Sequence, residues 1–592
     1  MKQGYHTLII GTGCAGYNAA DKLYDLGVRD IAVISEGRFM GTSRNTGSDK
    51  QTYYKLSLCG DKGDSVREMA DTLYSGGGVM GEHALCEAAY SVRCFMRLVE
   101  LGVPFPTNEY GEYAGYKTDH DPRSRATSCG PLTSKYMTEA LERSVLSKNI
   151  EIIDSERVIK ILIENDAVAG VACANTRTGE ISVIACQNVI LCTGGPAGIY
   201  KNTVYPESQH GATGLAVDAG ATLSNMEEWQ YGIASTKFRW NLSGTYQQVL
   251  PRYISVDKDG NEREFLYEKM GDKSLDMIFL KGYQWPFDVR KTEGSSKVDL
   301  LVAEEIKQGN RVYLDFSKNP RGLENGFDLL SEEAYTYLKK SGALFGTPIE
   351  RLGKMNEQAI KLYADHGIDL SSEYLEIAVC AQHCNGGVAV DEHWHSDIEG
   401  LYVAGEAAGT FGVYRPGGSA LNSTQVGSLR AAEHIAEKNV REIVTPSFKL
   451  PDIRYGKSNL AELREKYQNE MSRVADFDRS IKGIKKLFCD VDEFCESFFD
   501  IAQIEDISQI AELYRLYDMA LTQRATLSAM ICSADVIGTH GAAIVDRKLN
   551  GNSEKIRKTR TLTCGKASRQ SQISPMPSPE LWFETLLSRK RR

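Results

Sequence analysis

The sequence contains no hydrophobic run long enough to cross a membrane. None of its apolar stretches approaches the roughly 20 consecutive residues that a membrane-spanning helix needs. The first residues, MKQGYHTLIIGTG, enter a strand-like run at once, without the basic region and apolar core of a signal peptide. We therefore expect a soluble, cytoplasmic protein with no membrane span.

Positively charged residues are outnumbered by negatively charged ones. The chain carries 69 Lys and Arg residues against 79 Asp and Glu residues, which gives a formal net charge of −10 at pH 7. Such a balance does not favour a long groove for nucleic acid. We expect a small-molecule substrate and no nucleic-acid partner.

Closely spaced cysteine pairs are missing. The 14 cysteines are scattered and none forms a C-x-x-C pair, which argues against a disulfide framework and against an iron–sulfur cluster within the chain. The one compact group is CAQHC, with Cys380, His383 and Cys384, and only His393 and His395 lie near enough to complete a zinc site. Of a zinc site and a plain turn, we favour the turn and predict no metal.

The strongest motif lies at the N-terminus. YHTLIIGTGCAGYNAADKLYDLG is typical of a strand, a glycine turn and a helix, and DIAVISEGR adds a second strand that ends near Glu36. Gly11, Gly13 and Gly16 form G-x-G-x-x-G in the context that dinucleotide binding requires. The glycines let the backbone approach a pyrophosphate at the helix N-terminus, and Glu36 is expected to accept hydrogen bonds from the ribose.

Two later strands also end in glycine. The alternating stretch that closes with ACQNVILCTGG ends at Thr193, Gly194 and Gly195, and IEGLYVAG leads into Glu406. A mixed segment separates them, and a block with helix-spaced apolar residues follows. We predict an α/β fold: a Rossmann-like cofactor-binding domain with an inserted α+β capping domain and a C-terminal helical domain. The predicted ranges are 1–225 and 376–440 for the cofactor domain, 226–375 for the cap, 441–550 for the helical domain and 551–592 for a basic tail.

The tail is basic and punctuated by prolines, with one aromatic pair at Trp582 and Phe583. One interpretation is an extended tail whose aromatic side chains pack back on the body of the protein. The alternative is a strap that docks another protein chain.

Segments spread over most of the chain form a family pattern. Besides the glycine turn with Glu36 they are VILCTGG, LAVDAGATLSNMEEWQ, HCNGGVAV, GLYVAGEAAG, RPGGSALNSTQVG and the helical stretch that begins LREKYQNEMSRVADF. In this order the chain resembles the flavoprotein subunits of succinate dehydrogenase and fumarate reductase, together with L-aspartate oxidase and related soluble reductases. The resemblance implies that the Rossmann-like domain binds FAD.

The resemblance also implies where FAD would lie. The flavin ring would sit between the FAD-binding domain and the cap, Glu406 would bind the ribityl chain, and the backbone of Ala420 and Leu421 would meet the N1/O2 edge of the ring. A helix beginning near Ser419 would place its positive end against the charge of reduced flavin. The residues expected to contact FAD are Gly11, Gly13, Cys14, Ala15, Gly16, Glu36, Thr42, Ser43, Thr46, Gly47, Val158, Thr193, Gly194, Gly195, Gly405, Glu406, Ser419, Ala420 and Leu421.

Many members of this family attach FAD covalently through a histidine in the loop after the second strand. Here that loop is GRFMGTSRNTGSDKQT, which contains no histidine. We therefore predict non-covalent FAD.

The substrate-binding pattern of fumarate reductases is only partly present. Arg415 in RPGG matches the arginine that holds a substrate carboxylate, and its planar guanidinium suits that task. The family histidine that precedes the glycine pair falls on Gln382, with His383 beside it. The proton-donating cap arginine falls on Ser295, and the segment that resembles FHPTG in the family is QYGIAS, without a histidine.

These departures predict a substrate other than fumarate. We expect an FAD-dependent oxidoreductase that acts on a carbon–carbon bond next to a carboxylate or carbonyl, in the manner of an enoate reductase, with hydride transfer at flavin N5. The proton would come from Tyr414, His383, Lys297 or Arg252. Cap aromatics are candidates for a pocket wall or for the small core of the cap: Trp229, Tyr231, Phe238, Trp240, Tyr283 and Trp285.

Two alternatives remain open at this point. The chain resembles L-aspartate oxidase as well, and so is a candidate oxidase or dehydrogenase. It is also a candidate flavin subunit of an electron-transfer complex, in which its partner would be an iron–sulfur or other electron-donor subunit.

Overall fold

The computed structural model describes residues 4–60, 63–324, 326–438 and 440–534, together with three short strands at 543–544, 560–563 and 567–570. Most of the predicted basic tail, including Trp582 and Phe583, lies outside the described residues, so both interpretations of the tail stay predictions. No helix of the described part is long and apolar enough to span a membrane.

The main sheet is built around the N-terminal strand. Its strand order is β5-β2-β1-β8-β7-β6, and β17 pairs in parallel with the last residues of β8. β1, β2, β5, β8 and β17 pair with one another in parallel, whereas β7 pairs antiparallel with both β6 and β8. The bounds are β1 Gly4–Ile10, β2 Ile31–Ile34, β5 Glu151–Ile153, β6 Glu156–Glu164, β7 Ala167–Asn175, β8 Ile181–Leu191 and β17 Leu401–Val403.

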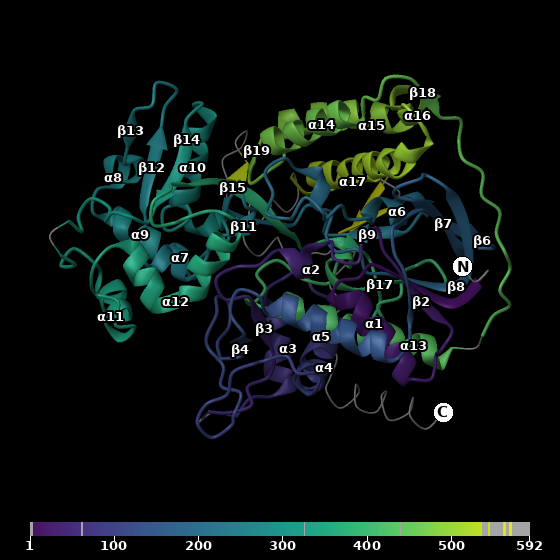
Figure 1. The fold of residues 1–592 in the computed structure, drawn as a ribbon, viewed down its shortest axis with the longest axis horizontal. Helices are drawn as coiled ribbons and strands as arrows, with labels where there is room; N and C mark the ends of the chain where they lie inside the picture. Colours follow the sequence, from purple (N-terminus) through teal and green to yellow (C-terminus); the bar gives the residue numbers. More distant parts are fainter. Residues whose placement is uncertain are drawn as a thin grey trace.

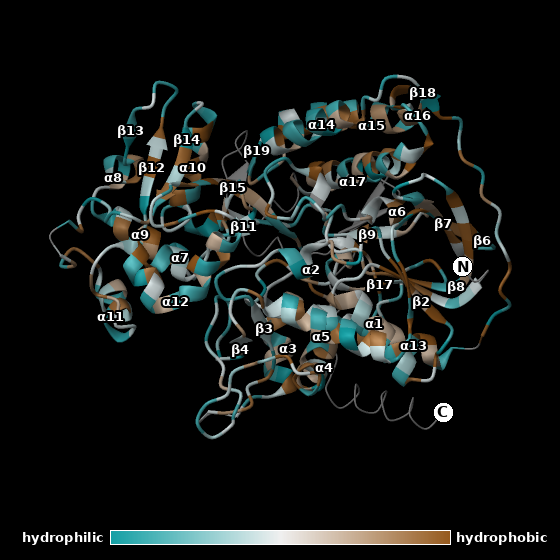
Figure 2. Cartoon of the chain, viewed as in Figure 1, coloured by the Kyte–Doolittle hydropathy of each residue, from teal (hydrophilic) through white to brown (hydrophobic). Residues whose placement is uncertain are grey.

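Helices cover one face of this sheet. α1 packs against both α5 and α13, and α13 also packs against α4, so the four lie together below the sheet in Figure 1. Their bounds are α1 Cys14–Asp25, α4 Gly81–Glu100, α5 Thr133–Ser147 and α13 Ser419–Glu437. The sheet strands are apolar because they are buried on both faces, and Figure 2 shows them largely brown. Short elements nearby are α2 Thr42–Asn45, β3 Thr52–Tyr54, α3 Val66–Ser75 and β4 Ala126–Ser128.

The capping unit forms the separate lobe on the left of Figure 1. Its sheet has the order β11-β10-β15-β14-β12-β13 and is antiparallel throughout. The strands are β10 Trp229–Ser235, β11 Trp240–Asn241, β12 Arg252–Val256, β13 Glu262–Arg263, β14 Arg311–Asp315 and β15 Leu375–Cys384. The helices are α7 Thr245–Gln248, α8 Phe265–Met270, α9 Lys273–Lys281, α10 Lys297–Lys307, α11 Glu332–Lys340 and α12 Pro348–Asp365.

One local prediction is wrong in this lobe. CAQHC is not a turn, because Cys380, His383 and Cys384 all lie in β15, which pairs with β10 along its length. The Cys380 side chain packs among Val204, Ala234 and Ala378. Within the described ranges, no group of three or more His, Cys, Asp or Glu side chains is placed to hold a metal ion.

The C-terminal helices lie on the side of the main sheet opposite α1 and α13 (Figure 1). They are α14 Leu460–Val474, α15 Ile481–Glu496, α16 Phe498–Ile501 and α17 Ile510–Ala534. α17 is buried on most of its surface, since it packs against α15 on one side and against α6 Thr213–Asp218 on the other. α14 is amphipathic and shows much teal in Figure 2. The sheet of β9 Thr222–Ser224 continues through β22 Arg560–Thr563 and β23 Ala567–Gln570. The exact domain boundaries stay a prediction.

Candidate active site

A cavity of about 810 Å³ runs between the main sheet and the cap. Its lining extends from Glu36, just beyond the end of β2, past Thr193 and Gly405 after β8 and β17, to Tyr283 and Trp285 in the cap. The carboxyl ends of parallel strands are where open α/β sheets bind ligands. The volume lies within the usual range for sites that hold a cofactor or small molecule.

The glycine turn fits a dinucleotide pyrophosphate. Gly11 has a φ of +115°, and a Cβ there would lie 2.4 Å from the carbonyl oxygen of Cys192. A Cβ on Gly16 would lie 1.9 Å from the carbonyl oxygen of Gly11, so the turn and the helix approach each other as closely as backbone allows. Gly13 caps the N-terminus of α1 without a side chain of its own, which leaves the first N–H groups near a site for an anion. Gly11, Gly13 and Ala15 line the cavity.

Cys14 and Gly16 do not line the cavity. The Cys14 thiol is buried against α5, with its sulfur 3.0 Å from Oγ1 of Thr138 and 3.4 Å from the carbonyl oxygen of Ser134. These two residues therefore form part of the turn without lining the cavity. The Cys14 side chain faces α5 and not the space for FAD.

Glu36 lines the cavity as a charged carboxylate. Burial acts to raise its pKa, but the nearby guanidinium groups of Arg157 and Arg515 lower it to about 2. Arg515 donates to Glu36 Oε2 from Nη2 at 2.5 Å and from Nε at 2.8 Å, and Arg157 donates to Oε1. A carboxylate held in this way accepts hydrogen bonds from ribose hydroxyls, as the sequence predicts for Glu36.

The loop after β2 supplies polar groups to the cavity wall. Thr42, Ser43, Thr46 and Gly47 all line it, and so do Val158, Thr193 and Gly194. Oγ1 of Thr42 and Oγ1 of Thr193 are buried, and neither has a hydrogen-bond partner within the part of the chain that the structure describes. Buried hydroxyls without partners are costly unless a ligand satisfies them, so they fit a polar cofactor in this cavity.

Glu406 lies deeper, in the turn η3 Gly405–Ala407. Burial raises the pKa of its carboxyl to about 7, although hydrogen bonds from Tyr205 and from the backbone of Cys384 oppose that shift. Oε1 accepts the Tyr205 hydroxyl and, at 3.0 Å, the Cys384 N–H. Gly195 does not line the cavity, but a Cβ on it would lie 2.3 Å from Glu406 Oε1, so its lack of a side chain makes room for this carboxyl.

α13 begins at Ser419, as predicted, and its N-terminus meets the cavity. Gly418 is its N-cap and adopts a left-handed conformation with φ of +91°. Ala420 and Leu421 line the cavity, whereas Ser419 does not. The positive end of a 19-residue helix therefore faces the ligand space.

Arg415 lines the cavity next to this helix. Nη2 donates to Gln230 Oε1 at 2.8 Å, and longer contacts reach Ser419 Oγ at 3.4 Å and Asn385 Oδ1 at 3.5 Å. Burial lowers the pKa of the guanidinium to about 10, which leaves it charged at neutral pH. All three hydrogen-bond partners are neutral, so Arg415 keeps a positive charge available to a ligand.

His383 lies beside Arg415 in a neutral state. Burial, and then the charge of Arg415, hold the pKa of the imidazole well below its usual range. Its Nδ1 lies 3.0 Å from Asn385 Oδ1, an oxygen that also accepts from Arg415. Nδ1 therefore carries the proton and donates it to Asn385, and Nε2 is left with a lone pair.

Gln382 and Gln230 come from paired strands of the cap sheet. Gln230 is opposite His383, and the register of β10 and β15 shifts directly after it, as at a β-bulge. Gln382 lines the cavity and is 8% exposed. Neither polar atom of its side chain has a hydrogen-bond partner among the residues that the structure describes.

The structure places two of the predicted proton donors away from the cavity. Lys297 does not line the cavity, and its ammonium lies on the surface 3.9 Å from Glu293. Arg252 also lies outside the cavity, where Glu264 and Asp315 each bind it at 3.0 Å. Tyr414 does line the cavity, and the Arg290 guanidinium stacks on its ring at 3.5 Å from the centroid.

The cap aromatics divide between the two roles considered for them. Trp229, Tyr283 and Trp285 line the cavity. The others belong to the buried part of the cap: Phe238 stacks on Trp240 with ring centroids 5.4 Å apart, and the Tyr231 hydroxyl lies 3.1 Å from that of Tyr200.

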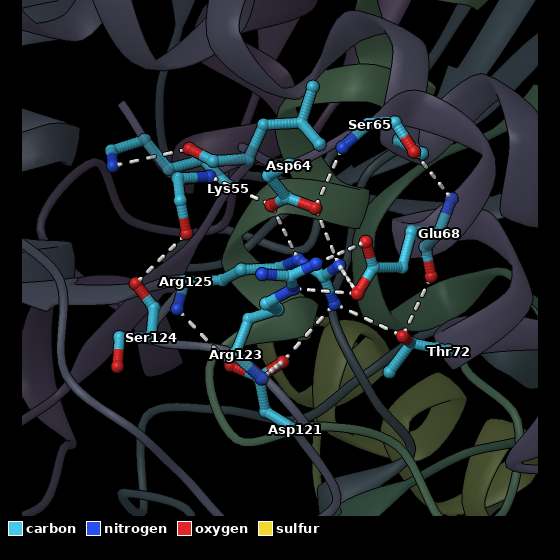
Figure 3. Close-up of polar contacts among 12 residues, drawn as sticks. Lys55, Asp64, Ser65, Glu68, Thr72, Asp121, Arg123, Ser124 and Arg125 are labelled. Carbon is cyan, nitrogen blue, oxygen red and sulfur yellow. Dashed lines mark hydrogen bonds and ion pairs between the residues drawn. The ribbon is translucent and has the colours of Figure 1, made fainter. Parts of the chain in front are cut away.

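Sequence reasoning missed a further wall of the cavity, formed by residues 116–120. Arg125, just after this segment, anchors it beside the N-terminus of α3: its guanidinium has no exposed surface and donates to both oxygens of Asp64 at 2.7 and 2.8 Å (Figure 3). It also binds Tyr54 at 3.0 Å and Asp121 at 3.2 Å. The only signal in the sequence is the density of charge in DHDPRSR, which is equally typical of a solvated loop.

Comparisons with known proteins agree with this geometry. A family profile described as an FAD binding domain matches residues 6–421. The chain is 26% identical over 556 residues to a fumarate reductase (CoM/CoB) subunit from Methanothermobacter marburgensis, a match that covers 90% of this chain and 93% of that protein. It is also 26% identical over 448 residues to L-aspartate oxidase from Agrobacterium fabrum, covering 73% of each.

Among solved structures, the chain is similar to FrdA of E. coli quinol fumarate reductase, with a TM-score of 0.69 and 18% identity over 97% of both chains. This likeness confirms the predicted fold class, an FAD-binding α/β domain with capping and helical domains.

Proposed function

The chain belongs to the FAD-binding family whose members include fumarate reductases and L-aspartate oxidases, and it is an FAD-dependent oxidoreductase; we propose that it reduces the carbon–carbon double bond of an enoate other than fumarate. The single observation that carries this proposal is the environment of Arg415. It is a partly buried guanidinium on the cavity wall whose hydrogen-bond partners are all neutral.

The side chains beside Arg415 favour a substrate with one carboxylate, although Lys50 and Lys117 line other parts of the cavity. Arg415 can hold one carboxylate through two parallel N–H groups. Lys291 is another cation on the wall, but its ammonium pairs with Asp119 at 3.1 Å. Gln230 and Gln382 offer uncharged amides where a second carboxylate of fumarate would need positive charge. Trp229 and Trp285 add flat apolar surface, which suits an aryl or alkyl substituent.

When bound, FAD supplies the hydride chemistry at N5 of its ring. The residues of this chain orient the substrate and deliver the proton. Arg415 polarises the carboxylate or carbonyl next to the double bond, and the N-terminus of α13 adds positive potential on the same side.

Tyr414 is the proposed proton donor. Burial is the main cause that raises the pKa of its phenol, so the hydroxyl stays protonated at neutral pH. His383 is less suited to this role because its proton is on Nδ1 and is directed at Asn385. Tyr414→Phe should slow the reduction step while leaving substrate affinity nearly unchanged, because the ring that stacks on Arg290 is retained.

The test is an anaerobic half-reaction. Flavin reduced with dithionite is mixed with fumarate and, separately, with aryl and alkyl enoates, and its absorbance is followed. We expect reoxidation by at least one monocarboxylic enoate and none by fumarate. Rapid reoxidation by fumarate would show that the site accepts a dicarboxylate. If no compound of the panel reoxidises the flavin, enoate reduction is contradicted.

A second candidate function is oxidation of an amine or acid, as in L-aspartate oxidase. The sequence similarity to L-aspartate oxidase from Agrobacterium fabrum favours it. Hydrogen peroxide formed in air on addition of an amino or hydroxy acid would support this function over reduction.

A partner protein is a further proposal. One relative is itself named as one subunit of a reductase. We infer that an iron–sulfur or other electron-donor subunit reduces this flavin, and co-purification of a cysteine-rich protein with the full chain would support that.

A further inference from the structure

A row of alternating charges connects the C-terminal helices to the ribose end of the cavity. Its members are Arg157 on β6, Glu36 after β2, Glu512 and Arg515 on α17, and Arg464 on α14. Arg515 is central, because it lies 2.5 Å from Glu36 and 2.7 Å from Glu512. Glu512 also pairs with Arg464, and Glu36 with Arg157.

The row is half-buried. The Glu36 side chain is 19% exposed and that of Arg515 is 20% exposed. The Arg157 side chain is only 3% exposed. Ion pairs of this kind hold a side chain in one position more firmly than pairs on an open surface do.

Glu36 needs a partner if it is to serve as an acceptor. Burial by itself would favour its protonated form, which has one oxygen fewer to offer. The two arginines keep it ionised and fix its orientation, and they come from elements 121 and 479 residues away along the chain. His210, which faces the same carboxylate, is held neutral because burial lowers its pKa to about 4. The positive charge that faces this carboxylate therefore comes from the arginines.

We propose that Arg515 is a positioning residue for FAD: through Glu36, the C-terminal helix α17 sets the affinity of the protein for the adenosine half of the cofactor. Arg515 itself does not line the cavity, so it acts through the carboxylate that does. Retention of FAD is then coupled to the packing of α14 and α17, which lie on the opposite side of the main sheet from α1 (Figure 1). This inference does not depend on which substrate the enzyme reduces.

The test uses full-length variants of the holoenzyme. Arg515→Met removes the charge, and Arg515→Lys retains it. Arg524→Met is the matched control, since Arg524 lies on the same helix but pairs with Asp492 and Glu496 instead. The dissociation constant of FAD is measured from the flavin fluorescence that appears on dilution. The dissociation constants of ADP and of FMN are measured by isothermal titration calorimetry in competition with FAD and corrected for the FAD affinity of each variant, because ADP reports the adenosine end and FMN the flavin end.

We expect Arg515→Met to weaken FAD and ADP binding by roughly tenfold, the loss typical for a group that supports a ligand-binding residue. FMN binding should stay unchanged, Arg515→Lys should recover part of the loss, and Arg524→Met should match the parent protein. Equal weakening of ADP and FMN would mean that Arg515 is only structural. Unchanged FAD affinity would overturn the inference outright.

Discussion

Burial changes the acid–base chemistry of the charged side chains around the N-terminus of α13. It lowers the pKa of Arg415 to about 10, and it raises the pKa of Glu406 to about 7 and that of Glu87 to about 8. Attraction between the arginine and the two carboxyl groups opposes each of these shifts, but desolvation is the larger effect for all three. At neutral pH the arginine therefore keeps its charge, while the neighbouring carboxyl groups are partly or mostly protonated.

Arg415→Met tests the proposed substrate contact. The methionine fills a similar volume but cannot bind a carboxylate, so we expect kcat/KM for the enoate to fall about 10²–10³-fold with FAD retained. Steady-state kinetics and the flavin-to-protein ratio are the measurements. Lys297→Met is the control, since Lys297 lies outside the cavity, and equal kinetics for Arg415→Met and the parent would refute the role of Arg415.

Glu87→Gln tests the effect of burial on stability. The pKa of about 8 in the folded protein lies above the ordinary 4.5, so the folded state binds more protons between these values. The contribution of Glu87 to stability is therefore fully present below pH 4.5 and is lost progressively as pH rises from there through about 8. The glutamine variant should be more stable than the parent at pH 9, by on the order of 4 kcal/mol, and nearly equal at pH 5. Urea unfolding at both pH values measures this, and a pH-independent difference would contradict it.

At the scale of elements, ion pairs hold the hairpin that carries the cavity wall. β4 pairs with β3, and Tyr116 forms an antiparallel bridge with Ala126 at the start of β4, so the chain turns back between them and residues 116–120 lie on the cavity wall. The buried guanidinium of Arg125 ties this loop to Asp64 and Asp121 (Figure 3). A buried carboxylate without this partner would be strongly destabilising.

Arg125→Met should expose that dependence. It leaves Asp64 and Asp121 as buried carboxylates with no guanidinium, which should lower the free energy of unfolding by about 3–5 kcal/mol. Arg67→Met is the matched control, because the pair of Arg67 and Asp71 is exposed and should contribute less than about 1 kcal/mol. Denaturant unfolding of both variants compares them, and similar losses would argue against a special role of Arg125.

At the scale of the whole molecule, the cavity is assembled from two lobes that are held together by polar contacts. Asp49 of the FAD-binding lobe accepts the N–H of Thr245 in the cap at 2.8 Å, and Lys291 of the cap reaches Asp119 at 3.1 Å. The FAD-binding lobe contributes the glycine turn and Arg415, and the cap contributes Gln230 and the tryptophans. Neither lobe contains the complete site.

The loop after β2 is relevant to whether FAD can be attached covalently. The loop at residues 37–52 lines the cavity through Thr42, Ser43 and Thr46 and carries no histidine to form a covalent bond. We expect acid precipitation of the protein to leave the flavin in the supernatant. Flavin that stays in the precipitate would show a covalent link from another residue.

The sequence by itself determined the cofactor and most of the fold. The glycine spacing, the acid after the second strand and the strands that end in glycine follow from local backbone requirements, which a short stretch of sequence already expresses. The start of α13 at Ser419 and the role of Gly418 as its cap are local in the same sense.

Only the tertiary structure decided which polar groups share the cavity. Lys297 and Arg252 satisfied the chemical requirement for a proton donor, but the fold places one on the surface and pairs the other with two carboxylates. CAQHC became a strand because β10 offered a partner, and Arg515 reached Glu36 from 479 residues away. These outcomes depend on long-range packing and on burial, and both are properties of the folded chain that the spacing of residues does not contain.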